Sequence, residues 1–134
     1  MNIFVNFPVD DVARSKAFYV ALGWPMDESM SSDDGGCFKL ADEQYVMALS
    51  RAMYESVGAT EALVGGPGTP SPVTVAFQLG SREEVDALLE RAEAAGARIG
   101  DTDDDDFMYQ RQFDDPDGYH FSPFWARSDD APSA

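Results

Sequence analysis

The chain is poor in residues that form disulfides or bind metals. Its 134 residues include one cysteine, Cys37, and one histidine, His120. A single cysteine excludes an intrachain disulfide, and the sequence does not open on a charged-then-apolar leader, so we expect a cytoplasmic protein of a reducing compartment. No apolar run approaches the length that spans a membrane, so no membrane segment is expected either.

Basic residues are also scarce. Nine Lys and Arg stand against 25 Asp and Glu, which gives a formal net charge of −16 at pH 7. Such a charge repels nucleic acid and anionic membranes, so we expect neither as a partner. Apolar residues, by contrast, make up 44% of the chain. That is enough for one domain, or for two half-domains that share a core, without disulfide or metal support.

The first half of the chain predicts one strand, one helix and three more strands. Residues 2–9 alternate as a half-buried strand, and a helix capped by Asp10 or Asp11 then runs to Gly23. Three short strands are predicted at about 24–30, 36–40 and 45–51, followed by a short helix over 52–57. The next residues, 58–72, are rich in Gly and Pro and predict an irregular connection.

The same pattern restarts after the connection. Residues 73–79 alternate as a strand, and Ser81 with Glu84 forms a capping box that opens an amphipathic helix ending at Gly96. Three more strands are predicted over 97–101, 107–114 and 119–125, the last two joined by a Pro-Asp-Gly turn. The polar tail, 127–134, is predicted to be disordered.

This repeated order of elements indicates an internal duplication, with a chance resemblance between unrelated halves as the alternative. The alignment pairs Val5 with Val75, Gly23 with Gly96 and Tyr45 with Tyr119. We predict an α+β fold in which two βαβββ modules form curved mixed sheets around a cavity, with the helices on the outer face. The predicted boundaries are 1–57 for the first module, 58–72 for the connection, 73–126 for the second module and 127–134 for the tail.

Alternation along the strands separates two faces. One is uniformly apolar and predicts a helix-covered core of Ile3, Val5, Phe7, Val9, Tyr45, Met47, Leu49, Val73, Val75, Phe77, Leu79, Tyr119, Phe121, Pro123 and Trp125. The other mixes apolar with uncharged polar side chains, as a ligand cavity does. The predicted cavity residues, including two from the penultimate strand, are Phe4, Asn6, Ala48, Ser50, Thr74, Gln78, Tyr109, Arg111, His120, Ser122 and Phe124.

Two stretches carry a family resemblance. The first is Ile3-Phe4-Val5-Asn6-Phe7-Pro8-Val9-Asp10-Asp11 with Ser15, Phe18, Tyr19 and Leu22-Gly23, and the second is Asp115-Pro116-Asp117-Gly118. Together they resemble the vicinal-oxygen-chelate superfamily, which includes glyoxalases, bleomycin-resistance proteins and extradiol dioxygenases. The resemblance covers nearly the whole chain. It implies paired βαβββ modules and a homodimer.

Metal-dependent members of that family hold a divalent metal through His, Gln or Glu side chains on the cavity strands. The resemblance places these ligands at Phe4, Ala48, Thr74 and Ser122. A phenyl, a methyl and two hydroxyl groups do not supply the nitrogen or carboxylate donors of such a site. No cofactor is therefore expected, and the family's lyase and dioxygenase mechanisms do not carry over. A divalent metal held through other residues stays open.

His120 is the one conventional general base or single metal ligand on the predicted cavity face, with a simple hydrogen-bonding role at the cavity mouth as the alternative. Asn6, Ser50 and Gln78 either orient a polar ligand or satisfy one another and water. Tyr109 and Arg111 either form an edge for a planar or anionic ligand or, for Arg111, pair with nearby acids. The pairing is favoured by the charge balance. These alternatives remain open from sequence.

Two further features point to structure rather than chemistry. The acidic run at 101–106 lacks the central glycine and terminal glutamate of a calcium loop, so a solvated turn is predicted. Cys37 is predicted to be a small core or cavity-wall residue, because Lys39 is the one nearby cation that could activate it.

Three functions fit these observations. The first is metal-free binding of a small organic molecule, as in bleomycin-resistance members of the family. The second is an enzyme, using either a displaced metal-ligand set or His120 as a base. The third is a structural domain whose cavity has closed. The acidic composition favours a neutral or cationic ligand.

Overall fold

The structure is a computed structural model that describes residues 1–57 and 65–127. The first half holds β1 (Ile3–Val9), α1 (Val12–Ala21), the 3₁₀ helix η1 (Glu28–Met30), β2 (Gly35–Ala41), β3 (Gln44–Ser50) and α2 (Arg51–Ser56). The second holds β4 (Thr74–Gln78), α3 (Arg82–Ala94), β5 (Arg98–Ile99), β6 (Asp103–Asp104), β7 (Met108–Gln110), β8 (Phe113–Asp114) and β9 (His120–Ala126). The predicted α+β class is confirmed. The predicted disorder of the tail at 128–134, and 58–64 of the predicted connection, lie outside the described residues.

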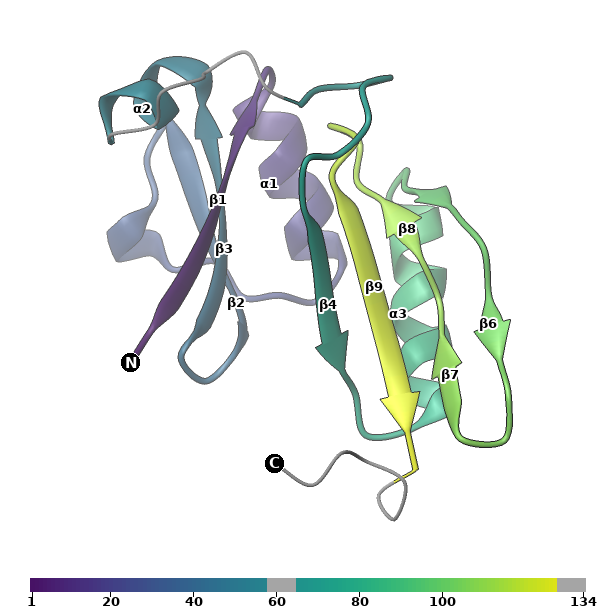
Figure 1. Cartoon of the computed structure of the whole chain (residues 1–134). Coiled ribbons are helices and arrows are strands. Elements are labelled where there is room, and N and C mark those ends of the chain that lie inside the picture. Colours follow the sequence, from purple (N-terminus) through teal and green to yellow (C-terminus); the bar gives the residue numbers. More distant parts are fainter. Residues whose placement is uncertain (58–64, 128–134) are drawn as a thin grey trace.

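The strands form two sheets rather than one. The first sheet has the order β1-β3-β2, with β1 and β3 parallel, and the second has the order β5-β8-β9-β7-β6, with β4 added in parallel to β9. In Figure 1, β1 and β4 are neighbouring edge strands in the middle of the molecule, and α1 and α3 lie behind their respective sheets. The long helices α1 and α3 therefore cover the same side and leave much of the other side of both sheets uncovered. The short helix α2 contacts β1 and β3, and Pro8 and Leu49 on the other side of the first sheet are buried.

Both long helices begin at the predicted caps. The Asp11 carboxylate accepts a hydrogen bond from the backbone N–H of Arg14 (3.0 Å), and Ser81 Oγ accepts one from that of Glu84 (3.1 Å). Such caps satisfy backbone N–H groups that have no partner inside the helix. Across the described residues, no helix combines the length and apolar character needed to cross a membrane.

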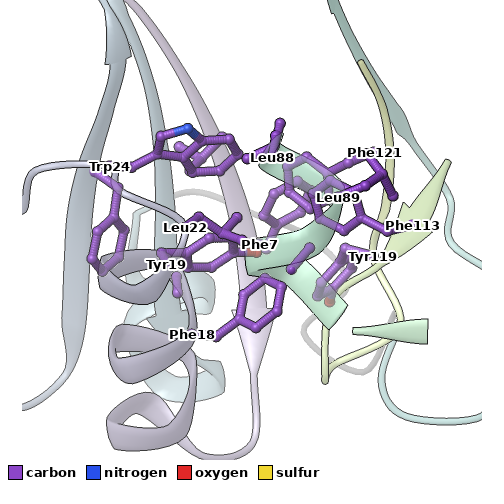
Figure 2. Packing of buried hydrophobic residues seen from close by; sticks show 14 of the residues in the cluster. Phe7, Phe18, Tyr19, Leu22, Trp24, Leu88, Leu89, Phe113, Tyr119 and Phe121 are labelled. Atoms are coloured by element: carbon purple, nitrogen blue, oxygen red, sulfur yellow. The ribbon is translucent and has the colours of Figure 1, made fainter. Parts of the chain in front are cut away.

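One hydrophobic core joins the two halves. Phe7 of β1 stacks on Tyr119 with ring centroids 4.4 Å apart, and Tyr19 of α1 packs edge-on to Phe121 at 6.0 Å. Within the second half, Phe113 of β8 stacks on Phe121 of β9 with ring centroids 5.1 Å apart. Figure 2 shows these rings gathered between the elements of both halves. The prediction of a shared core is confirmed.

The Asp-Pro-Asp-Gly turn is tied to α1 by buried hydrogen bonds. The Asp117 carboxylate, which is fully buried, accepts from Ser15 Oγ (2.6 Å) and Arg14 Nη2 (2.8 Å). Gly118 has φ of +89°, and a Cβ there would lie 2.7 Å from the carbonyl oxygen of Gly66, so both backbone angle and space require glycine. The family-like residues of the two stretches thus hold the two halves together.

Asp115 organises the turn itself. Its carboxylate accepts from the backbone N–H groups of Asp117 and Tyr119, both at 2.9 Å, and from the Tyr19 hydroxyl. Tyr119 in turn donates to the carbonyl oxygen of Pro8 at 2.5 Å. Burial is the largest cause that raises the pKa of Asp115, to about 6, although its hydrogen bonds oppose that shift.

The predicted strand at 24–30 is wrong. The structure has only an isolated bridge at Met26 and the single turn η1, which Asp27 caps by accepting from Ser29 N (3.0 Å). Pro25 lacks an N–H, and its carbonyl oxygen accepts from Lys39 N at 2.9 Å. The segment follows the edge of β2 without forming a full ladder.

The acidic run at 101–106 is exposed, as predicted, but it is not only a turn. Asp103 and Asp104 form β6, which pairs with β7, and the Asp105 carboxylate accepts from the N–H groups of Phe107 and Met108, both at 2.8 Å. These hydrogen bonds lower the pKa of Asp105. The run therefore forms the short strand β6 and the start of the turn that joins β6 to β7.

The predicted faces of β3 are reversed. Phe4 lies opposite Tyr45 in the parallel pair, and Thr74 lies opposite His120 in the equivalent pair of the second half. Tyr45 therefore corresponds to His120, not to Tyr119, and a slip of one residue exchanges the two faces of a strand. As a result, Tyr45 and Met47 leave the predicted core, and Val46 and Ala48 belong to it. Leu49 is buried, at 5% exposure, but it lies outside the cluster that joins the two halves. Ile3 is 53% exposed and is also not a core residue.

Candidate ligand-binding face

We call the side of the two sheets that α1 and α3 leave uncovered the open face. Cross-strand register and alternation define its residues. The first half supplies Phe4, Asn6, Pro8, Tyr45, Met47 and Leu49. The second half supplies Thr74, Ala76, Gln78, Gln110, Gln112, Asp114, His120, Ser122 and Phe124. Seven predicted cavity residues lie there: Phe4, Asn6, Thr74, Gln78, His120, Ser122 and Phe124.

Two predicted cavity residues of the first half lie elsewhere. Ala48 is fully buried in the shared core, where it lies opposite Phe7. Ser50 caps α2, because its Oγ accepts from the backbone N–H of Met53 at 3.1 Å. Both corrections follow from the register of β3.

Tyr109 and Arg111 also lie on the other side of the sheet. The Tyr109 hydroxyl and Arg111 Nη1 both donate to the Asp86 carboxylate of α3, at 2.5 and 2.9 Å. The hydrogen bond from Tyr109 is the largest cause that lowers the pKa of Asp86. The Arg82 guanidinium lies 5.0 Å from the centre of the Tyr109 ring. Arg111 thus pairs with an acid, which was the favoured alternative, and neither residue lines the open face.

The second half of the open face carries polar side chains without protein partners. They are Thr74, Gln78, Gln110, Gln112 and Ser122. Across residues 1–57 and 65–127, none of these five side chains makes a hydrogen bond to the protein. Ser122 is the most buried of the five, at 3% exposure. Thr74 and Gln78 are exposed to water, whereas Gln110 and Gln112 are half-buried and Ser122 is buried. Buried or half-buried polar groups usually find partners, and a ligand or bound water would supply them for these three.

His120 and Asp114 form a pair at one end of this polar surface, in the same row as Thr74. They lie opposite each other on β9 and β8, and His120 Nδ1 is 2.7 Å from Asp114 Oδ1. The side chains are 27% and 29% exposed. Sequence reasoning missed Asp114, although it directly precedes the turn that leads into the strand of His120.

The first half of the open face is apolar. Phe4 stacks on Tyr45 with ring centroids 4.7 Å apart. Beside them, a cavity of about 180 Å³ is lined by three methionines and five other residues: Met30, Met47, Met53, Asn6, Ser32, Gly35, Leu49 and Val57. Methionine side chains adapt their shape easily, so such a lining accepts apolar groups of varied outline.

A groove of about 440 Å³ lies between the two sheets. Figure 1 shows the neighbouring edge strands β1 and β4 from which most of its walls come. Ile3 and Val5 of β1 and Tyr45 of β3 line one wall. Phe77 and Gln78 of β4 lie on the other. Ile3, Val5 and Phe77 have the parity of the helix-covered side, whereas Tyr45 and Gln78 belong to the two halves of the open face. A ligand in the groove can therefore touch both halves of the open face at these two residues.

The corrected register moves one of the family's metal-ligand positions. In the first half, the equivalent of Ser122 is Met47 rather than Ala48, so the four positions hold Phe4, Met47, Thr74 and Ser122. A phenyl, a thioether and two hydroxyls do not fit a divalent metal that takes nitrogen and carboxylate ligands. In the described part of the chain, no three His, Cys, Asp or Glu side chains are arranged to hold a metal ion.

The fold has known counterparts. Hypothetical protein SA1046 from S. aureus is 23% identical, with a TM-score of 0.76 over 94% of each chain. A glyoxalase/bleomycin resistance protein/dioxygenase family enzyme from Burkholderia phytofirmans PsJN is 21% identical, with a TM-score of 0.73 over 92% of this chain and 97% of that one. A lactoylglutathione lyase from Agrobacterium tumefaciens is 20% identical, with a TM-score of 0.66 over 93% and 92%. At these identities the likeness shows the fold alone.

The sequence of the chain gives the family directly. The sequence model of the Glyoxalase/Bleomycin resistance protein/Dioxygenase superfamily matches residues 3–122. No curated protein matches the chain. Because the family match spans most of the 134 residues, the chain belongs to the Glyoxalase/Bleomycin resistance protein/Dioxygenase superfamily.

Proposed function

We propose that the chain binds a small organic molecule on its open face without a divalent metal. The observation that carries this proposal is the group of buried or half-buried polar side chains without protein partners, Gln110, Gln112 and Ser122, beside the exposed Thr74 and Gln78. Supporting it, the family's metal-ligand positions hold side chains that are poor ligands for such a metal. Few convergent polar groups beside apolar walls are what small-molecule sites use.

The two parts of the face suit two ends of one ligand. The apolar end packs against Phe4, Tyr45 and the methionine-lined cavity, and the polar end meets the amides and hydroxyls of the second half. The net charge of −16 favours a neutral or cationic ligand over an anionic one.

A second copy of the chain is the proposed partner. The open face is uncovered in one chain, and small-molecule sites enclose most of their ligand. The family resemblance implies a homodimer. If its interface covers the open face, the second copy encloses the ligand. Light scattering during size exclusion tests this. A strictly monomeric protein at the concentrations where it binds ligand would overturn the dimer while leaving the binding site in place.

Ligand binding is tested by thermal unfolding against a panel of small organic molecules in buffer that contains a chelator. A ligand at 100 times its Kd stabilises the folded state by about 2.7 kcal/mol. We expect at least one compound of the panel to stabilise the protein in this way. Asn6→Trp and Gln78→Trp should weaken the binding of that compound at least tenfold, because the larger side chains fill the open face. Ala94→Trp, at an exposed position of α3, is the matched control and leaves affinity unchanged.

Metal content separates this proposal from metal-dependent chemistry. The purified protein is incubated with Ni, Mn, Fe and Zn separately, desalted and subjected to elemental analysis. Far less than one metal per chain is expected. A value near one would overturn metal-free binding and move a lyase or dioxygenase to first place.

A metal-free enzyme is the second candidate, because Asp114 holds His120 at 2.7 Å in the way that an orienting carboxylate holds a general base. It predicts turnover of a bound compound that His120→Ala abolishes while binding persists. Binding without turnover in the unmodified protein rules it out for that compound.

A further inference from the structure

We propose that Asp114 fixes His120 in the tautomer that carries its proton on Nδ1, so that Nε2 accepts a hydrogen bond from an O–H or N–H group of the ligand. The tautomer stands on the structure alone. The ligand class rests on the proposed function, which it makes more specific.

The Nδ1 contact sets the tautomer. Asp114 Oδ1 lies 2.7 Å from His120 Nδ1, the length of a hydrogen bond to a charged group. An ionised carboxylate only accepts hydrogen bonds, so Nδ1 must carry the hydrogen that is shared. In a neutral imidazole the other nitrogen is then unprotonated and acts as an acceptor.

The backbone holds the pair in this geometry. Asp114 and His120 are register partners at the start of the β8–β9 hairpin, and Phe113 stacks on Phe121 directly beside them. Asp115 closes the turn through hydrogen bonds to two backbone N–H groups. The carboxylate is therefore in place before any ligand arrives, which lowers the entropic cost of binding.

Nε2 is the ring nitrogen left for a ligand. Within the part of the chain that the structure describes, it has no hydrogen-bond partner. The register partner of His120 on β4 is Thr74, which is uncharged. The next open-face residue on β9 is Ser122. The charged groups in its row are Asp114 on β8 and, beyond it, Arg98 on β5. Among these residues only Asp114 hydrogen-bonds to the ring.

These groups favour a particular ligand chemistry. An acceptor nitrogen next to a carboxylate attracts alcohols, phenols, amines and amides that bring their own hydrogen, and it repels carboxylates. Leaving a buried ligand donor or acceptor unpaired costs binding free energy, so an ether in place of the hydroxyl is discriminated against. The site therefore selects neutral or cationic molecules that carry a hydrogen-bond donor.

Nitrogen NMR of His120 tests the tautomer without any ligand. The chain has one histidine, so labelling histidine with ¹⁵N reports this ring alone. At a pH where the ring is neutral, we expect the shift of a protonated nitrogen at Nδ1 and of an unprotonated one at Nε2. In Asp114→Asn the new amide can also donate to Nδ1, so the population with the proton on Nε2 should rise severalfold. Asp103→Asn, at an exposed site on β6, is the control and should change nothing.

A protonated Nε2 in the unmodified protein would overturn the tautomer assignment, as would an unchanged tautomer in Asp114→Asn. The backbone spectrum shows whether that variant is folded. Asp114→Ser, which removes the carboxylate without adding an amide, is the second variant. It should also lose the fixed tautomer.

Matched probe pairs test the ligand class. Phenol against anisole, and aniline against N,N-dimethylaniline, are titrated while the Nε2 resonance is followed. We expect the donor-bearing member to bind at least tenfold more tightly, and the ratio to fall to about twofold or less in Asp114→Asn. Equal affinities, or no binding by either pair, would overturn the ligand class. The tautomer would still stand or fall on the ligand-free spectrum, so the two failures are distinguishable.

Discussion

The two halves of this chain share a topology and differ in what they expose. At equivalent positions of the open face, the first half holds Phe4 and Tyr45 and the second holds Thr74 and His120. The helix-covered sides are apolar in both halves and meet in one core. The shared core therefore constrains one face of every strand, and the other face is free to diverge towards apolar packing in one half and hydrogen bonding in the other.

The largest expected effect comes from placing a carboxylate first on one face of β3 and then on the other. Ala48→Glu places a carboxylate in the shared core, where Ala48 is fully buried, and should cost about 3–5 kcal/mol of unfolding free energy. Met47→Glu, one residue away on the open face, should cost about 1 kcal/mol or less. Urea unfolding measures both. Similar losses in the two variants would contradict the corrected register.

The hairpin turn of the second half buries the carboxyl group of Asp115, whereas that of the first half exposes the carboxylate of Asp42. The stability of the protein should therefore depend on pH through Asp115 and not through Asp42. The folded-state pKa of Asp115 is raised from 3.8 to about 6, so the folded protein binds the proton more tightly than the unfolded chain. The stabilisation from this group is therefore fully present below pH 4 and is lost as the pH rises through about 6. The change is at most about 3 kcal/mol, since each pKa unit corresponds to about 1.36 kcal/mol.

Asp115→Asn should remove that part of the pH dependence, because the amide oxygen still accepts from the backbone of Asp117 and Tyr119. Asp42→Asn is the control in the first half, where the side chain is 96% exposed. The measurement is urea unfolding at pH 4.5 and pH 7. If Asp115→Asn and the unmodified chain showed the same difference between the two pH values, the buried carboxylate would not be its source.

The smallest expected effect compares the helix caps. Asp11→Ala in the first half and Ser81→Ala in the second each remove one acceptor for a backbone N–H, and each should cost about 1 kcal/mol. Because one core joins the halves, both variants should unfold in a single transition at a lower midpoint. Two separate transitions would show that the halves unfold independently.

The sequence was informative wherever the signal is local. Caps at Asp11 and Ser81, the glycine turn at Gly118 and the apolar alternation of β1, β4 and β9 each predicted an element that the structure contains. These signals depend on backbone hydrogen bonds and side-chain spacing within a few residues. The fold class and family followed from them.

The residues of the open face were predicted in part. Phe4, Asn6, Thr74, Gln78, His120, Ser122 and Phe124 do share one face, as alternation implied. Ala48 and Ser50 do not, because alternation gives two faces without saying which one a helix covers. Tyr109 and Arg111 turned to Asp86, a partner more than twenty residues away in the sequence.

The amino-acid sequence by itself determined the order of the main strands and helices and the apolar side of β1, β4 and β9. Only the tertiary structure decided the register of β3, the pairing of Asp114 with His120 and the lack of protein partners for the polar row of the second half. The physical reason is range. Local signals fix a strand, but its face and its neighbours depend on which distant segments pack against it, and here the length of the turn that Asp115 closes sets what lies opposite His120.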